Sequence, residues 1–151
     1  MVNALNVGNS ILNKAFIENI DITPMKLQKM IYFVYRGYLQ KTNLTLFNER
    51  FETWKYGPVV PSVYVYFKNY GSNAIKQYAT ESDGLTILIV NENSSPDFKE
   101  VIEDVWSHCK ALDGIYLSSL THAEGTAWRK AYETHNPYLL DDDIKSEEVI
   151  F

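Results

Sequence analysis

The sequence predicts an α+β fold that is mostly helical: a compact helical domain with a small antiparallel sheet. Apolar residues recur at helical spacing in several stretches, whereas only two short runs have the pattern or composition of a strand. The length of 151 residues suits one ordinary domain, so we expect a single domain over residues 1–151. Hydrophobic residues make up 46% and charged residues 22%, which is typical of a globular chain that buries its own core.

Two helices are predicted in the first part of the chain. Over residues 5–20, apolar residues fall on one helical face and mostly polar residues on the other. The second helix, residues 24–40, has a clearer start, because Thr23 can cap it and Pro24 occupies its first position, where the missing N–H does no harm. Apolar residues cover more than half of its surface. We therefore expect the second helix to lie at the centre of the core.

A short strand and a rigid connector are predicted next. Residues 51–56 alternate at period two until Gly57 and Pro58 stop the run. The stretch WKYGPVVPSVY, residues 54–64, contains two prolines, so neither a long helix nor a central strand can run through it. We predict that this stretch joins the strand rigidly to a third helix, which starts at about Pro61.

The rest of the chain is predicted to contain a second strand candidate and several helices. Residues 85–90 form a β-branched run that could pair with the earlier strand. Helices are expected over residues 96–109 and 113–120, and Thr126 can cap another. A last turn is expected within residues 146–151, which would dock the end of the chain.

The sequence offers little catalytic or metal-binding chemistry. The histidines and the single cysteine show no metal-ligand spacing, and the glycines form no phosphate-binding loop. Cys109 falls on the apolar face of its helix, where a buried, inert thiol is favoured over a nucleophile. His122 and Glu124 are the best acid–base pair, although Glu124 is already explained by a capping box with Thr121. We expect no metal, no cofactor and no enzyme; an enzyme that uses His122 and Glu124 is the less favoured alternative.

The charge of the chain bears on its partners and location. Nineteen acidic residues against 14 basic residues give a net charge of -5, so phosphate backbones are repelled on average and nucleic acid is disfavoured as a ligand. Lys26, Lys29 and Arg36 form a modest basic cluster that keeps a DNA-binding regulator open, but solvated surface lysines are the simpler interpretation. With no long apolar run, no secretory signal and a lone cysteine, we expect a cytoplasmic protein without a membrane span.

Aromatic residues are more suggestive of a function. Eleven tyrosines and three tryptophans indicate either an aromatic core or a protein interface, where tyrosine is favoured, and both interpretations stay open. Within the connector we expect Trp54 to lie mostly in the core, with Tyr56 and Tyr64 nearer the surface.

Three long motifs together resemble a known family. They are TPMKLQKMIYFVYRGYL at residues 23–39, FETWKYGPVVPSVYVYFKNYGS at residues 51–72 and LTHAEGTAW at residues 120–128. In order and spacing the chain resembles the Panacea domain of prokaryotic antitoxins, which includes SocA-like antitoxins and phage-associated GepA-like proteins. One departure is that Thr126 is followed by Ala127, where many relatives carry a proline, which should soften the helix start without altering the fold.

The resemblance implies a mostly helical domain with a small sheet that binds a toxin encoded beside it and neutralises that toxin by direct contact. In the SocA-like branch it implies delivery of the toxin to a Clp-type protease. It implies no metal, nucleotide or catalytic residue, and a regulatory, DNA-binding protein of a phage or mobile element is the alternative. The candidate partner-binding residues are Lys26, Gln28, Lys29, Tyr32, Trp54, Lys55, Tyr56, Gly57, Pro58, Val59, Pro61, Tyr64, His122, Glu124 and Trp128.

Overall fold

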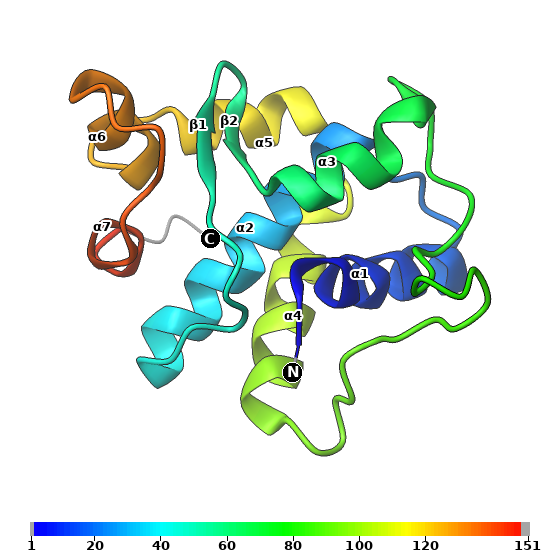
Figure 1. The fold of residues 1–151 in the computed structure, drawn as a ribbon. Helices are drawn as coiled ribbons and strands as arrows, with labels where there is room; N and C mark the ends of the chain where they lie inside the picture. Colours follow the sequence, from blue (N-terminus) through cyan, green and yellow to red (C-terminus); the bar gives the residue numbers. More distant parts are fainter. Residues whose placement is uncertain (1, 149–151) are drawn as a thin grey trace.

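The computed structural model describes residues 2–148, and its helices surround one long central helix (Figure 1). The α-helices are α1 (Ala4–Glu18), α2 (Pro24–Thr42), α3 (Pro61–Phe67), α4 (Pro96–Cys109), α5 (Gly114–Thr121), α6 (Ala127–Glu133) and α7 (Asp141–Lys145), and a short 3-10 helix, η1 (Lys68–Tyr70), follows α3. Strands β1 (Glu52–Trp54) and β2 (Gly57–Val59) form a two-stranded antiparallel sheet. The predicted fold class, mostly helical with a small antiparallel sheet, is confirmed.

Helix α2 is the centre of the core, as its apolar surface predicted. It packs against α1, α3, α4, α5, α7 and β2, and Figure 1 shows it running through the middle of the molecule. The side chain of Thr23 accepts a hydrogen bond from the backbone N–H of Lys26, and Pro24 starts the helix. Leu27, Met30 and Ile31 are fully buried. The cap and the burial together fix where α2 begins and which face turns inward.

Gly37 sets how closely α2 approaches α4. A Cβ atom at this position would lie 2.8 Å from Cγ1 of Val101, closer than real carbon contacts, and the β-branched valine cannot easily rotate away. We therefore expect Gly37→Ala to destabilise the fold by about 1–3 kcal/mol, even though alanine favours a helix. The matched control is Gly8→Ala in α1, where the new Cβ would lie 3.4 Å from Ile31, an ordinary contact. Thermal unfolding of both variants checks this, and equal melting temperatures would contradict it.

The strand predicted at residues 85–90 is wrong. These residues, all of them described, form no strand and run beside α1. The Asn9 amide donates a hydrogen bond to the carbonyl of Leu88 at 3.1 Å, and the N–H of Val90 donates to the hydroxyl of Ser10 at 2.9 Å. Polar side chains of a helix thus take the place that a neighbouring strand would have filled.

The true partner of β1 lies inside the predicted connector. Residues 57–59 pair with residues 52–54, with Thr53 opposite Pro58 and Trp54 opposite Gly57. A proline is tolerated here because a two-stranded sheet consists of edge strands alone. The connector does continue into α3 at Pro61, as predicted.

Two predictions about helix ends near the C-terminus are corrected. Thr121 does not open a capping box with Glu124; it is the last residue of α5, and its hydroxyl donates to the carbonyl of Ser118 at 2.6 Å. Thr126 caps α6 as predicted. The last helical turn forms earlier than expected, as α7, with Ser146 at its end, and residues 149–151 lie outside the described residues.

Cys109 is fully buried, which confirms its predicted place in the core. Burial raises the pKa of its thiol to about 11, so the nucleophilic thiolate is disfavoured near neutral pH. None of the helices found in residues 2–148 combines the length and apolar character needed to cross a lipid bilayer.

Candidate functional site

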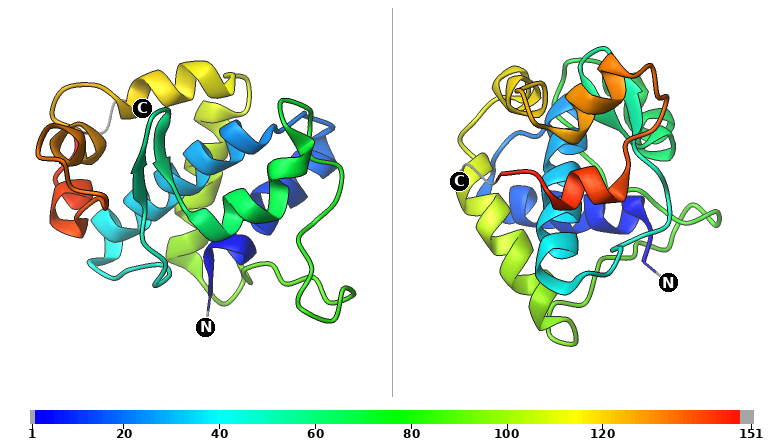
Figure 2. Two further views of the ribbon diagram at one scale, coloured as in Figure 1. Left: turned by 45° about the horizontal axis from the view of Figure 1, so that its top comes forward. Right: turned by 90° about the vertical axis from the view of Figure 1, so that its left-hand side faces the viewer.

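The three motifs, which are far apart in the sequence, meet around the β1–β2 hairpin. The hairpin turn consists of Lys55 and Tyr56, and β2 packs against both α2 and α5. Figures 1 and 2 show the hairpin lying over α2, with α5 behind its tip, α6 to one side and α3 to the other. Side chains of these helices reach the backbone of the hairpin.

The hairpin tip is held from α5 and α6. Side chains of these helices and of His122, directly after α5, meet three consecutive carbonyls. Trp128 Nε1 donates to Trp54 at 2.7 Å, His122 Nε2 lies 3.0 Å from Lys55, and the Ser118 hydroxyl donates to Tyr56. The other ring nitrogen of His122 lies 2.6 Å from the carbonyl of Ser118, and the ring packs edge-on against Trp128. Both nitrogens of His122 therefore face backbone oxygens, and neither is paired with Glu124 in the described residues.

The far end of the hairpin is held from α2. Gln28 forms a reciprocal pair with Val60, accepting from its N–H at 3.0 Å and donating to its carbonyl at 3.1 Å. Lys29 donates from Nζ to the carbonyl of Pro58 at 3.2 Å. An amide side chain thus serves Val60 as a neighbouring strand would, and both ends of the hairpin are fixed by side chains from distant segments.

Position 57, directly after the hairpin turn, can hold only glycine without strain. Its φ of +117° lies in the region that side chains rarely adopt. An added Cβ would also come within 2.6 Å of the Thr121 hydroxyl and 3.0 Å of Lys29 Cε. The close approach of α2 and α5 to the hairpin therefore depends on this residue.

The expectation of solvated lysines on α2 is wrong, because both lysines are buried. Lys26 donates from Nζ to the carbonyl of Lys110, at the end of α4, at 2.6 Å, and its pKa is lowered by loss of solvent. Lys29 is 1% exposed, and burial lowers its pKa to about 8. Both lysines lie on α2, as the helical pattern predicts. Their alkyl stems and amines are nevertheless covered by the hairpin and by α4 and α5.

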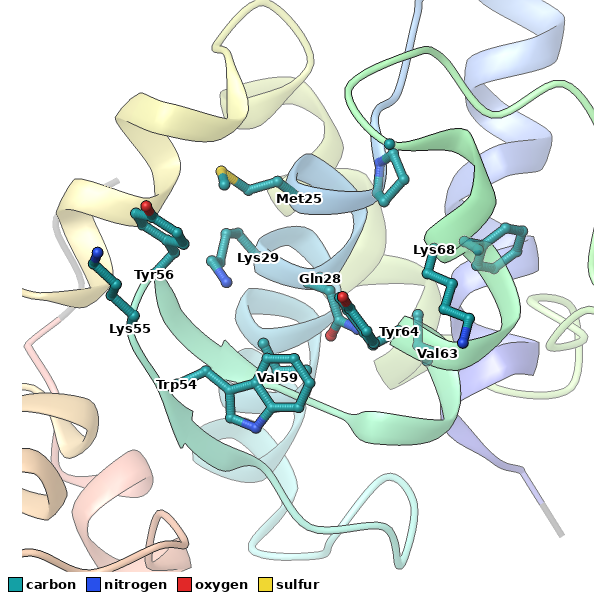
Figure 3. A pocket seen from close by; sticks show the side chains of 13 residues that line it. Met25, Gln28, Lys29, Trp54, Lys55, Tyr56, Val59, Val63, Tyr64 and Lys68 are labelled. Carbon is teal, nitrogen blue, oxygen red and sulfur yellow. The ribbon is translucent and has the colours of Figure 1, made fainter.

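A pocket of about 490 Å³ opens beside the hairpin (Figure 3). Its walls are mainly apolar, and the buried Gln28 and Lys29 contribute polar atoms; the lining residues are Pro24, Met25, Gln28, Lys29, Trp54, Lys55, Tyr56, Val59, Val63, Tyr64, Phe67, Lys68 and Gly71. Trp54, which we expected mostly in the core, is only partly buried: it stands in the pocket wall, with its ring centroid 4.8 Å from that of Tyr64. Tyr56 and Tyr64 are 56% and 44% exposed, as predicted.

Most of the candidate partner-binding residues come together here, at different depths. Buried ones are Lys26, Gln28, Lys29, Tyr32, Gly57, Pro58, Val59 and Trp128; half-buried ones are Trp54, Pro61 and His122; exposed ones are Lys55, Tyr56, Tyr64 and Glu124. Seven of the fifteen line the pocket: Gln28, Lys29, Trp54, Lys55, Tyr56, Val59 and Tyr64. The surface that a partner could touch at this site is therefore formed by Trp54, Lys55, Tyr56 and Tyr64, which we call the hairpin face.

The sequence did not indicate the role of Glu147, which binds the buried hydroxyl of Tyr32. Its buried carboxylate accepts hydrogen bonds from the Tyr32 hydroxyl at 2.5 Å, from Arg36 Nη1 at 3.0 Å and from the N–H of Ala127 at 2.7 Å. The pKa of Tyr32 is raised well above its usual value by burial and by the Glu147 charge. This cluster joins α2, the start of α6 and the segment after α7, so it supports the elements behind the hairpin.

Comparison with known proteins agrees with this arrangement. A family model described as antitoxin SocA-like, Panacea domain, matches residues 27–129, a range that contains the hairpin and the side chains from Gln28 to Trp128 that hold it. The chain is 36% identical over 129 residues to antitoxin SocA of Caulobacter vibrioides, and the alignment covers 84% of this chain and 69% of that protein. No solved structure matches the chain. The chain therefore belongs to the family of SocA-like antitoxins with a Panacea domain.

Proposed function

We propose that the protein is an antitoxin that neutralises a toxin encoded beside it through direct contact at the hairpin face. Membership of the antitoxin family supports the role and, in general, a toxin partner. The observation that carries the proposed contact is that a hairpin held by side chains of three helices still exposes Tyr56, while Tyr64, also exposed, packs against Trp54 in the wall of the same pocket. Aromatic side chains on a fixed backbone are common interface anchors because little entropy is lost when they bind.

The proposed contact predicts which tyrosines matter. Tyr56→Ala and Tyr64→Ala should each weaken toxin binding by about 2 kcal/mol, roughly thirtyfold in Kd, and leave thermal stability nearly unchanged because both side chains are largely exposed. The product of the neighbouring gene is co-expressed and purified, and binding is measured by calorimetry. Tyr116→Ala is the matched control, since Tyr116 is 51% exposed on α5 and does not line the pocket. Equal loss in all three variants, or protection from toxicity without any binding, would count against the proposal.

Delivery of the bound toxin to a Clp-type protease is the more detailed mechanism that we propose. An adaptor contacts two proteins at once, so it needs a second surface apart from the hairpin face. Leu85 is 83% exposed and Ile87 is 46% exposed, on the long loop between η1 and α4, which lies away from the hairpin turn in Figures 1 and 2. The half-life of the toxin should shorten only when antitoxin and protease are both present. Full protection with an unchanged half-life would indicate blocking instead.

The alternatives weighed from the sequence gain no support from the site. The three basic residues behind the DNA-binding alternative are buried and do not face solvent. Lys26 and Lys29 bind backbone carbonyls, and Arg36 pairs with Glu147. His122 is occupied by the hairpin and not by Glu124. We therefore propose a binding function without a catalytic step.

A further inference from the structure

The charge of the pocket is opposite to that of the protein. The chain has 19 acidic and 14 basic residues. Nevertheless Lys29, Lys55 and Lys68 line the pocket, and the lining residues include no aspartate or glutamate. None of these three lysines belongs to an ion pair formed within residues 2–148. The pocket is thus a cationic site on an acidic molecule, which favours an anionic group as its occupant.

Lys29 is the part of this site that most needs a partner. Its protonated amine carries three hydrogens, but the carbonyl of Pro58 is the single acceptor that it finds among residues 2–148. The side chain is almost wholly buried, and Figure 3 shows its amine directed into the space beside Tyr56. A buried ammonium without a counter-ion is unfavourable, and desolvation accordingly lowers its pKa to about 8. A carboxylate in the pocket would supply both the missing charge and the missing acceptors.

The remaining walls specify what should accompany the carboxylate. Val63 and Phe67 of α3, together with the rings of Trp54 and Tyr64, make the pocket mainly apolar. A volume of about 490 Å³ holds a few side chains and not a single small anion. The hairpin face continues this apolar surface outward, so the occupant that fits best is a segment of a protein.

We infer that the pocket receives an acidic residue of a partner protein, whose carboxylate pairs with Lys29 while a flanking apolar side chain packs against Trp54 and Tyr64. This inference rests on the proposed function, under which the partner is the toxin. Lys55 and Lys68 attract the carboxylate at the rim. The other titratable groups that line the pocket are the hydroxyls of Tyr56 and Tyr64. The nearby carboxylate of Glu52 accepts from Nε1 of Trp54 at 2.8 Å, and the α5 residue closest to Gly57, Thr121, does not titrate.

The test compares two capped peptides that differ in one group. Acetyl-Phe-Glu-Leu-amide and acetyl-Phe-Gln-Leu-amide are titrated into the full chain near neutral pH and followed by NMR. The Glu peptide should bind roughly tenfold more tightly, because hydrogen bonds between charged groups are about twice as strong as neutral ones. This preference should vanish in Lys29→Met, weaken severalfold in Lys68→Gln, and decline above a pH of about 8, where the Lys29 amine loses its proton. Lys99→Gln, an exposed residue that does not line the pocket, should keep the full preference.

Several outcomes would overturn the inference. Equal binding of the two peptides, or shifts centred away from the pocket, would remove its basis. Binding of 4-phenylbutyrate as tightly as the Glu peptide would identify a site for a small acid and not for a protein segment. If circular dichroism shows that Lys29→Met is poorly folded, Lys68→Gln takes its place, and an undiminished preference for the Glu peptide in that variant would contradict the inference. If the toxin binds the wild type and both lysine variants equally, the inferred carboxylate site is wrong and the proposed function stands. If the preference for the Glu peptide holds but the toxin does not bind the wild type, the proposed function is wrong instead.

Discussion

Replacing Glu147 with alanine is expected to destabilise the fold by about 3–5 kcal/mol, because it removes one member of a buried ion pair. The carboxylate is buried against Arg36 and also accepts from Tyr32 and from the first backbone N–H of α6. That N–H belongs to a helix end, where no carbonyl of the helix can replace the lost acceptor. One substitution thus loosens α2, α6 and the segment after α7 together.

The control for this prediction is the neighbouring carboxylate. Glu148 is exposed, so Glu148→Ala should change the free energy of unfolding by less than about 0.5 kcal/mol. Urea unfolding followed by circular dichroism measures both variants. If Glu147→Ala loses no more than Glu148→Ala, the cluster around Tyr32 and Arg36 does not stabilise the fold in the way described.

Lys29→Met is expected to stabilise the protein near neutral pH by about 1–2 kcal/mol. The pKa of Lys29 is lowered to about 8 in the folded state, against about 10.4 for an unfolded lysine, which corresponds to an unfavourable term of about 3 kcal/mol. Removing the amine relieves this term but also removes the hydrogen bond to Pro58, worth about 1 kcal/mol. The same variant should lose binding, so stability and function oppose one another at this residue.

The sign of the pH dependence follows from the lowered pKa. Below a pH of about 8 both states hold the proton, and the folded state bears the full unfavourable term. Between about pH 8 and pH 10.4 the unfolded chain still holds a proton that the folded chain has released, so wild-type stability rises with pH. The advantage of Lys29→Met should therefore shrink across this window and be gone above it. Lys99→Met is the exposed control, and a Lys29→Met variant that is less stable than wild type at every pH would refute the prediction.

The elements that the sequence predicts best are those with local signals. Thr23 with Pro24 marks the start of α2, and Pro61 and Pro96 mark the starts of α3 and α4, because a proline at the first helical position is a purely local effect. The three motifs likewise identify the family, and the structure brings their residues into contact. The exposure of Tyr56 also follows from its place in the turn.

What the sequence does not predict depends on partners far along the chain. Strand β2 exists because Gln28 and Lys29 hold the backbone around Pro58 and Val60, and nothing local to a Gly-Pro pair indicates that. Residues 85–90 look like a strand, but side chains of α1 bind the carbonyl of Leu88 and the N–H of Val90 in place of a neighbouring strand. Charged residues are normally assigned to the surface, so Lys29 and Glu147 could not be placed without knowing which segments cover them.

The way the hairpin is held has a consequence for the order in which the molecule matures. The tip at residues 54–56 depends on donors from Ser118, His122 and Trp128, which leave the ribosome more than sixty residues later. During synthesis the N-terminal helices can already pack, but the hairpin has no fixed tip until α5 and α6 have emerged and docked. A nascent or truncated chain would therefore lack the ordered hairpin face, and the ability to bind would arise only as the last third of the polypeptide is completed.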